Sequence, residues 1–180
     1  RRQRQMCIRD RLCGTLIVFA QLSFMRSQSL GVKTNQTLVV KFPGHTEGLN
    51  TKLEAMKKTI ARLPLVYQVT FSGAVPGEEV ATFLSNRRTN DALKQNRLYE
   101  MLACDPDYVD AYGLQVVAGR NFSEDYGDDV DKLVINETAV RNLGFTSNDE
   151  AIGELVNVEC TDAPMQIIGV VKDYHQQALS

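Results

Sequence analysis

Histidine is the side chain that most readily moves protons near neutral pH, and this chain has two. His175 follows Asp173 by two residues in the segment KDYH, whereas His45 lies in a turn with no chemical partner close by in the sequence. A catalytic pair also needs an activated Ser or Cys, and the chain has neither a G-x-S-x-G nor an H-E-x-x-H motif. The pattern favours a structural or surface histidine. Hydrolysis by Asp173 and His175 is the weakest of three functional alternatives.

An acidic loop near residue 125 offers carboxylates for a divalent cation. Its members are Glu124, Asp125, Asp128, Asp129 and Asp131. Their spacing does not fit the D-x-[DN]-x-[DN]-G pattern that wraps Ca²⁺, so a solvated turn is the better interpretation. No G-x-x-x-x-G-K-[ST] or G-x-G-x-x-G motif is present to cradle a phosphate. We therefore expect no metal site, no cofactor and no catalytic residue.

The four cysteines, Cys7, Cys13, Cys104 and Cys160, have no C-x-x-C or other metal-ligand spacing. Cys104 and Cys160 would pair only if their strands are neighbours. Unpaired cysteine commonly behaves as a small buried apolar residue, and we favour that interpretation for both. The cysteines do not assign a cellular compartment.

The charge of the chain argues against nucleic-acid binding. The 180 residues carry a net charge of −2, but the opening RRQRQMCIRDR holds five arginines and one aspartate. The remaining residues have 15 basic and 21 acidic side chains, a net charge of −6. Binding to duplex phosphates needs a clustered excess of Lys and Arg, so no nucleic-acid partner is expected. The length and ordinary composition fit one globular domain with a single core.

An apolar stretch, LCGTLIVFA (Leu12–Ala20), follows the arginines. It is much shorter than the roughly 20 residues of a membrane span, and it allows a truncated span, a signal peptide or a buried helix. No convincing small-residue cleavage site follows it. Polar residues continue to Ser27, and Gly31 can end a helix. We favour the end of a truncated transmembrane helix that continues as a stalk.

Beyond residue 30, the pattern predicts mixed strands and helices. A β-branched strand at 37–42, an amphipathic helix at 49–63 and an alternating strand at 65–73 predict a βαβ unit. The polar stretch 80–96 is interpreted as a long excursion. Later strands are expected at 97–105, within 114–122 (a strand followed by a turn), and at 132–136, 150–159 and 165–174, with short helices at 106–113 and 137–145. Gly153 and Gly169 lie inside the last two strands and indicate bulges or close backbone approach. Without strict alternation, this order predicts an α+β fold.

Several segments occur in an order that resembles a known family. They are QLSFMRSQSLGVKTNQTLVVKFPG, VTFSGAVPGEE, CDPDYVDAYGLQVVAGRNFSED, LVINETAVRNLGF, EAIGELV and IIGVVKDYHQQAL. Together they resemble the extracytoplasmic core domain of MacB/FtsX-type ABC transporter permeases, in the branch whose ATPase is a separate polypeptide. The resemblance covers about residues 20–180.

The resemblance implies a two-lobed α+β domain, with a porter-like βαβ lobe and a strand-rich second lobe, preceded by the end of a transmembrane helix. It implies an inner-membrane protein whose domain lies in the periplasm and couples cytoplasmic ATP-driven motion to periplasmic events, by mechanotransmission or export. The implied partners are the remainder of the permease, a separate ABC ATPase, a dimeric assembly, and a periplasmic adaptor or substrate. The alternative is a stand-alone secreted or membrane-anchored ligand-binding domain.

The family motifs carry twelve residues with expected structural roles. They are Pro76, Gly77, Asp105, Tyr108, Gly119, Arg120, Asn136, Gly144, Gly153, Gly169, Asp173 and His175. Gly119 is expected to form a tight turn that leaves Arg120 exposed. Asn136 can cap the following helix, and Gly144 can end it with left-handed dihedral angles. Gly169 is expected to permit close packing of the lobes.

The opening eleven residues have a separate explanation. RRQRQMCIRDR resembles, codon for codon, the translation of a widely used transposase library adapter, as found in fragmented metagenomic assemblies. A positive anchor before a span is the alternative. The expected organisation is therefore an artefact at residues 1–11, the end of a truncated transmembrane helix and stalk at 12–27, and a MacB-like periplasmic core domain at 28–180.

Overall fold

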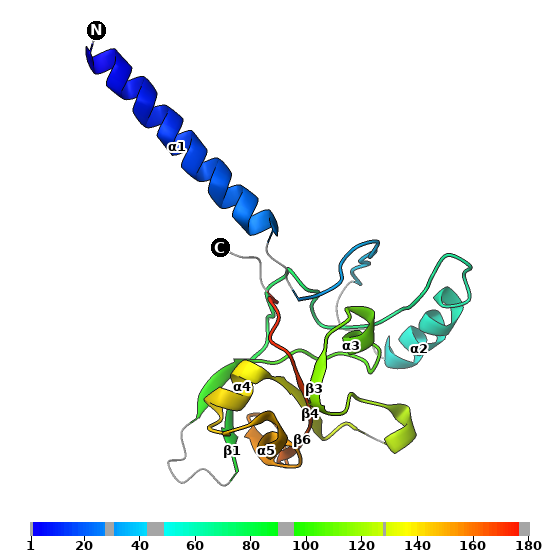
Figure 1. Cartoon of the computed structure of the whole chain (residues 1–180). Coiled ribbons are helices and arrows are strands. Elements are labelled where there is room, and N and C mark those ends of the chain that lie inside the picture. Colours follow the sequence, from blue (N-terminus) through cyan, green and yellow to red (C-terminus); the bar gives the residue numbers. More distant parts are fainter. Residues whose placement is uncertain (1, 28–30, 43–48, 90–95, 128, 177–180) are drawn as a thin grey trace. The chain divides into compact units, whose positions relative to one another are not determined.

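The fold is described here from a computed structural model that places residues 2–27, 31–42, 49–89, 96–127 and 129–176 (Figure 1). The chain divides into two compact units, one within residues 1–30 and one within residues 31–178. His45 and Asp128, which the sequence singled out, lie outside the described residues.

The first unit is a single helix, α1 (Arg2–Ser27). Its described side chains, from residue 11 to residue 24, are exposed, including the apolar Leu16, Ile17 and Phe19. No helix in the described ranges combines the length and the apolar character needed to cross a bilayer.

The second unit is an α+β fold, which confirms the predicted fold class. Its six strands are β1 (Phe83–Arg88), β2 (Arg97–Glu100), β3 (Val116–Gly119), β4 (Lys132–Asn136), β5 (Leu155–Val158) and β6 (Met165–Val171). Its helices are α2 (Leu49–Ile60), α3 (Tyr108–Ala111), α4 (Glu137–Asn142) and α5 (Asn148–Ala151), with a 3₁₀ turn at Glu124–Tyr126. All six strands belong to one sheet.

Strand β6 is the central strand of this sheet and pairs with three others. β4 runs parallel to it along one edge. β5 and β3 are antiparallel to β6 and pair with it at Met165–Gln166 and at Gly169–Val171, respectively. β1 joins β5 and β2, both in antiparallel pairs. The strand Met165–Val171 is buried over its last five residues, as expected for a strand paired on both edges and covered by helices.

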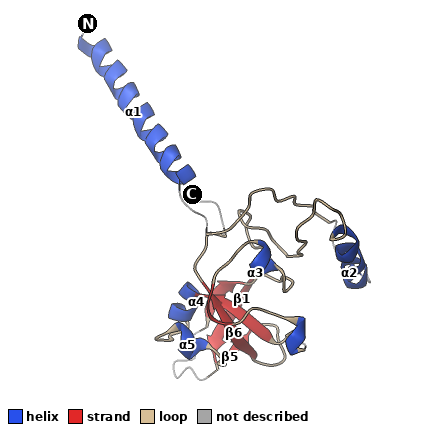
Figure 2. Ribbon diagram, turned by 45° about the vertical axis from the view of Figure 1, so that its right-hand side comes forward, coloured by secondary structure: helices blue, strands red, loops and turns tan. Residues whose placement is uncertain are grey.

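Two hydrophobic clusters form the core. The larger one lies between the sheet and helices α4 and α5, which lie next to each other beside the strands (Figure 2). Its buried members are Ala118, Leu133, Val140, Phe145, Ala151, Val156, Val158, Ile167 and Val170. The smaller one surrounds α3 and contains Tyr108, Val109, Tyr112, Leu114 and Val171. Neither cluster includes a described residue of 37–42 or 49–71.

The predicted βαβ unit is wrong in its strands. Residues 37–42 and 65–71 are extended or irregular and join no ladder, and only an isolated bridge joins Ser72 to Cys104. The helix between them is present as α2. The β-branched residues favour extended backbone locally, but a strand needs a hydrogen-bonded neighbour, and Leu38 and Val40 are exposed.

Two further expectations need correction. The polar stretch interpreted as an excursion contains β1, whose Asn86 is buried between the partner strands β2 and β5. Gly153 lies in the turn between α5 and β5, not inside a strand. Its positive φ of 86° explains why glycine is found there.

Candidate functional site

Asp105 lies at the centre of a polar cluster, hereafter the Asp105 hub, that joins α2 to the segment before α3. Lys57 Nζ donates to Asp105 Oδ2 at 2.6 Å and lies 2.5 Å from Asp107 Oδ2. The Thr70 hydroxyl also donates to the Asp105 carboxylate, and the Phe71 amide donates to it at 3.1 Å. One carboxylate therefore receives donors from a helix and from an extended segment.

The central charges of the hub are largely withdrawn from water. The side chains of Lys57 and Asp105 are 18% and 12% exposed. Burial lowers the pKa of the Lys57 ammonium, but the hydrogen bonds and charges of Asp105 and Asp107 outweigh burial and raise it above its ordinary value. Lys57 is therefore a charged, paired lysine at neutral pH.

Two tyrosines that follow the hub in the sequence, Tyr108 and Tyr112, pack against each other. Tyr108 is 2% exposed, and its ring lies 4.8 Å from that of Tyr112, measured between centroids. Burial is the main reason that the pKa of the Tyr108 hydroxyl is raised above its ordinary value. Burial, with a contribution from the Asp105 charge, raises the pKa of the Cys104 thiol to about 11. These groups stay neutral at pH 7, so neither supplies a nucleophile or a base.

Gln176 ties the end of the described chain to the Pro76-Gly77 turn. Its side-chain amide donates to the carbonyls of Val75 at 2.9 Å and Glu78 at 3.2 Å. The amide of Gly77 donates to the Gln176 carbonyl at 2.7 Å. Three hydrogen bonds thus hold together two segments that lie about a hundred residues apart in the sequence.

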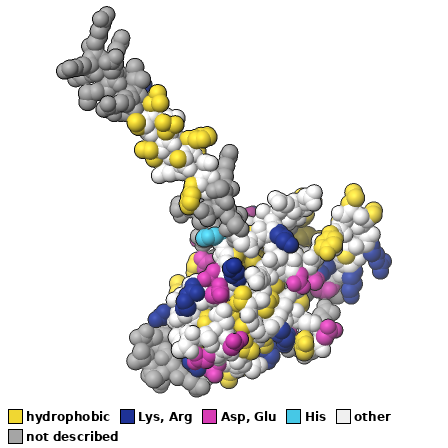
Figure 3. Space-filling model, viewed as in Figure 1, with side chains coloured by type: hydrophobic (Ala, Val, Ile, Leu, Met, Phe, Trp, Pro, Cys, Tyr) yellow, Lys and Arg dark blue, Asp and Glu magenta, His cyan; other side chains and the backbone are white. Residues whose placement is uncertain are grey.

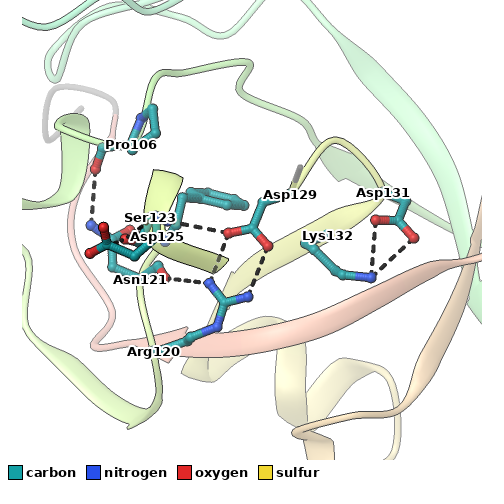
Figure 4. A network of polar contacts seen from close by, with 9 residues as sticks. Pro106, Arg120, Asn121, Ser123, Asp125, Asp129, Asp131 and Lys132 are labelled. Carbon is teal, nitrogen blue, oxygen red and sulfur yellow. Dashed lines mark hydrogen bonds and ion pairs between the residues drawn. The ribbon is translucent and has the colours of Figure 1, made fainter. Parts of the chain in front are cut away.

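The acidic loop closes on Arg120 (Figure 4). The guanidinium donates two parallel 2.8 Å hydrogen bonds to Asp129 and lies 4.3 Å from the Tyr126 ring centroid. The hydrogen bond with Arg120 is the largest influence on the carboxyl of Asp129 and holds its pKa at about 2. The expectation that Arg120 is exposed was wrong. Its side chain is only 31% exposed, because it pairs with Asp129 and packs against Tyr126.

Asp173 ties the end of β6 to the start of α4. Its carboxylate accepts from the Thr138 amide and hydroxyl, both at 2.8 Å, and from Arg141 at 2.9 Å. Burial raises the pKa of Asp173, but these hydrogen bonds prevail and lower it overall. His175 is exposed, and Asp173 is fully engaged by α4. The structure does not bring these two residues together as a catalytic pair.

The ends of α4 are set by the residues that the motif marked. The Asn136 side chain accepts from the Ala139 amide at 2.9 Å, which satisfies one free donor of the first turn. Gly144, with a φ of 83°, follows the last turn, and its amide donates to the Arg141 carbonyl at 3.1 Å.

Comparison with known proteins identifies this arrangement. The model of the MacB-like periplasmic core domain family matches residues 14–180. The chain belongs to this family.

Solved structures of similar domains are longer than this MacB-like chain. The periplasmic region of MacB from Actinobacillus actinomycetemcomitans is 20% identical, with a TM-score of 0.46 over 69% of this chain and 51% of its own. The extracellular domain of the noncanonic ABC-type transporter YknZ from Gram-positive bacteria is 20% identical, with a TM-score of 0.48 over 67% of this chain and 57% of its own. The chain thus spans about half the length of these solved domains. No curated protein matches it significantly.

In the MacB-like domain, two glycines allow the paired strands β3 and β6 to approach closely. Gly119 and Gly169 are register partners, and a Cβ on Gly119 would overlap the Ile168 carbonyl oxygen and lie 2.7 Å from Ile152 Cδ1. A Cβ on Gly169 would overlap the Arg120 carbonyl oxygen. The close approach at Gly169 is therefore between strands of one sheet, not between two lobes as expected.

The polar side chains described above pair with one another and hold segments of the domain together. No group of three His, Cys, Asp or Glu side chains in these ranges could hold a metal ion. Cys104 and Cys160 are both free thiols, so the structure has no disulfide between them. In the described part of the acidic loop, Asp129 is occupied by Arg120, and Asp125 accepts from Ser123 at 3.3 Å.

Sequence reasoning missed the donors of the hub and the Gln176 contact. Lys57 had a detectable signal, because it follows Met56 and precedes Ile60 by three residues on the half-buried side of α2. A lysine on that side indicates a buried acidic partner. Thr70 and Gln176 lie 35 and 101 residues from their partners, and no local pattern connects them.

Proposed function

We propose that this chain is the extracytoplasmic domain of an ABC transporter permease and that it transmits motion from the membrane to the periplasm. The family match over residues 14–180 is the observation that carries this proposal. ATP binding to a separate cytoplasmic ATPase would move the transmembrane helices, and this domain would pass that motion to a periplasmic adaptor or substrate. The complete transporter would be dimeric and located in the inner membrane.

The contacts of Gly31 support a route for that motion. A Cβ placed on this residue would lie 3.2 Å from Tyr174 Cβ, which is three residues beyond the last residue of β6. Two residues further on, the Lys33 amide donates to the Tyr112 carbonyl at 2.8 Å. A displacement of residues 31–33 would therefore be passed through Tyr174 to strand β6. Residues 12–27 would serve as the outer end of a transmembrane helix and the stalk.

The first test of this function is the DNA on both sides of the coding region. Long-read sequencing is expected to find an apolar half-helix upstream, several apolar spans downstream and a neighbouring gene with a Walker-motif ATPase. A native origin of RRQRQMCIRDR, together with a stop codon soon after Ser180, would refute the permease and favour a stand-alone binding domain.

The second test addresses transmission in the complete transporter reconstituted with its ATPase. Gly31→Val places a β-branched residue at a φ of 75° against Tyr174, whereas Gly127→Val changes a glycine with a φ of 87° in open space. We expect Gly31→Val to retain ATP hydrolysis and lose export, and Gly127→Val to retain both. Equal export by the two variants would contradict a route through Gly31.

A further inference from the structure

Residues 37–42 and 49–71, hereafter the arm, contribute no side chain to either hydrophobic cluster of the described domain. Several of its large apolar side chains are exposed, and Leu65 and Tyr67 are 97% and 100% exposed. Figure 3 shows hydrophobic and basic side chains together on the surface over α2. Burial of apolar area is the usual force that fixes one part of a domain to another, and in the arm this burial is only partial: side chains such as Met56, Ile60 and Phe71 are half-buried, and none described is fully buried.

Polar contacts attach the arm instead, and most of them converge on the Asp105 hub. Besides Lys57, Thr70 and Phe71, the hub includes Gln68, whose side-chain amide donates to the Asp107 carbonyl at 3.3 Å. A second ion pair, Lys41 with Glu78 at 2.7 Å, has side chains that are 74% and 44% exposed. Exposed pairs contribute little, so the less exposed Lys57 carries most of the ionic attachment.

Lys57 is also the only one of these donors that comes from α2 among the described residues. Gln68, Thr70 and Phe71 lie on the extended segment that leads into the core at Ser72. Without Lys57, α2 would keep its covalent connection to that segment but lose its charged contact with the core. Removal of one partner from a buried ion pair also leaves the other charges uncompensated, which adds to the cost.

We propose that Lys57 is a releasable latch, which holds the arm against the core through Asp105 and Asp107 and whose loss frees the arm while the core stays folded. The latch concerns motion within the domain and does not rest on the transport function. Because its strength is electrostatic, high salt weakens it, but by less than it would weaken an exposed pair, since the side chains of Lys57 and Asp105 are mostly buried.

The test is hydrogen–deuterium exchange of the full 180-residue chain, which measures the opening of each segment separately. Lys57→Met removes the charge and keeps much of the side-chain volume. Lys58→Met is the matched control, because Lys58 is the exposed neighbour on the same helix. Lys57→Arg restores a positive charge.

In Lys57→Met, the amides of α2 and of 66–71 should exchange at least about tenfold faster, the scale expected for loss of a partly buried pair. Those of β6 should be unchanged. Lys58→Met should match the parent chain, and Lys57→Arg should recover most of the protection. The proposal is overturned if Lys57→Met leaves α2 exchange unchanged, if β6 loses protection to the same extent, or if the variant fails to fold.

A salt titration of the parent chain tests the latch without any substitution. Raising NaCl from about 0.1 M to about 1 M shortens the Debye length from about 10 Å to about 3 Å. Exchange in α2 should rise with salt relative to exchange in β6. Equal responses of α2 and β6 would show that the arm is an integral part of the core and would overturn the proposal.

Discussion

Gly119→Ala should destabilise the domain by about 3–5 kcal/mol, a large fraction of the total stability of a domain of this size. At the φ of 68° an alanine costs about 1–2 kcal/mol in backbone strain. Its Cβ would also overlap the Ile168 carbonyl oxygen and lie only 2.7 Å from Ile152 Cδ1, which is closer than two carbon atoms can approach without a shift. Separation of the strands to relieve this overlap costs about 1–3 kcal/mol and weakens the 2.9 Å hydrogen bond from the Arg120 amide to Ile168.

Gly144→Ala isolates the backbone part of this cost. Gly144 has a φ of 83° and no atom within 4 Å of an added Cβ, so its substitution should cost only about 1–2 kcal/mol. The difference of about 2–3 kcal/mol between the variants measures the cost of disturbing the close approach of β3 and β6.

Urea-induced unfolding of the full chain, followed by circular dichroism, provides the measurement. With a slope of about 2 kcal/mol per molar urea, Gly119→Ala should lower the midpoint by about 2 M and Gly144→Ala by less than about 1 M. If the two variants differ by less than about 1 kcal/mol, the sheet relaxes around the methyl group and the reasoning from the close approach is refuted.

Three further predictions concern single side chains. Asn136→Ala removes the cap that Ala139 donates to, and the unfolding free energy should fall by about 1 kcal/mol in the same urea assay. The pKa of Asp129 is lowered from 3.8 to about 2, so its stabilising effect is complete above pH 3.8 and is lost as the pH falls through about 2. The full shift corresponds to about 2.5 kcal/mol, which solvent screening reduces to about 1 kcal/mol, and acid titration of the parent and of Asp129→Asn should differ in this range. Finally, the Cys104 thiol, with a pKa of about 11, should react with iodoacetamide at pH 8 far more slowly than the exposed Cys160, as measured by mass spectrometry of peptides.

A specific result would contradict each of these three predictions. An unchanged unfolding midpoint in Asn136→Ala would mean that water replaces the cap. Parallel acid titration curves for the parent and Asp129→Asn would mean that the pair with Arg120 contributes nothing to stability. Equal alkylation rates of Cys104 and Cys160 would contradict the burial of Cys104.

The elements that could be predicted from the sequence are those whose signals are local. The run KLVIN followed by ETAVRNLGF contains its own strand, cap and helix; β4 has the predicted bounds 132–136, whereas α4 begins at Glu137 as predicted and ends at Asn142, three residues earlier than predicted. β1 could not be predicted, because FLSNRR is polar and becomes a strand only through its neighbours β2 and β5. The opposite error occurred at 37–42, where good local propensity has no hydrogen-bonded neighbour in the described structure.

The polar contacts were less predictable than the fold. Asp105 and Asp173 were identified as motif residues, but their partners Lys57 and Thr138 lie 48 and 35 residues away. Such pairs depend on the tertiary fold, and only the position of Lys57 on a half-buried helix side gave notice of one.

The central position of β6 has a consequence for the order of folding. Among the described strands, β3 and β4 pair with β6 alone, and β6 begins only at Met165. As the chain emerges from the ribosome, the β1–β2 hairpin can form early, but β3 and β4 must wait, unpaired, for β6. During that interval the apolar residues of both strands are exposed to aggregation. The domain therefore adds β3 and β4 to its sheet only in a late step, and a chain interrupted before Met165 could form at most the β2–β1–β5 part of it.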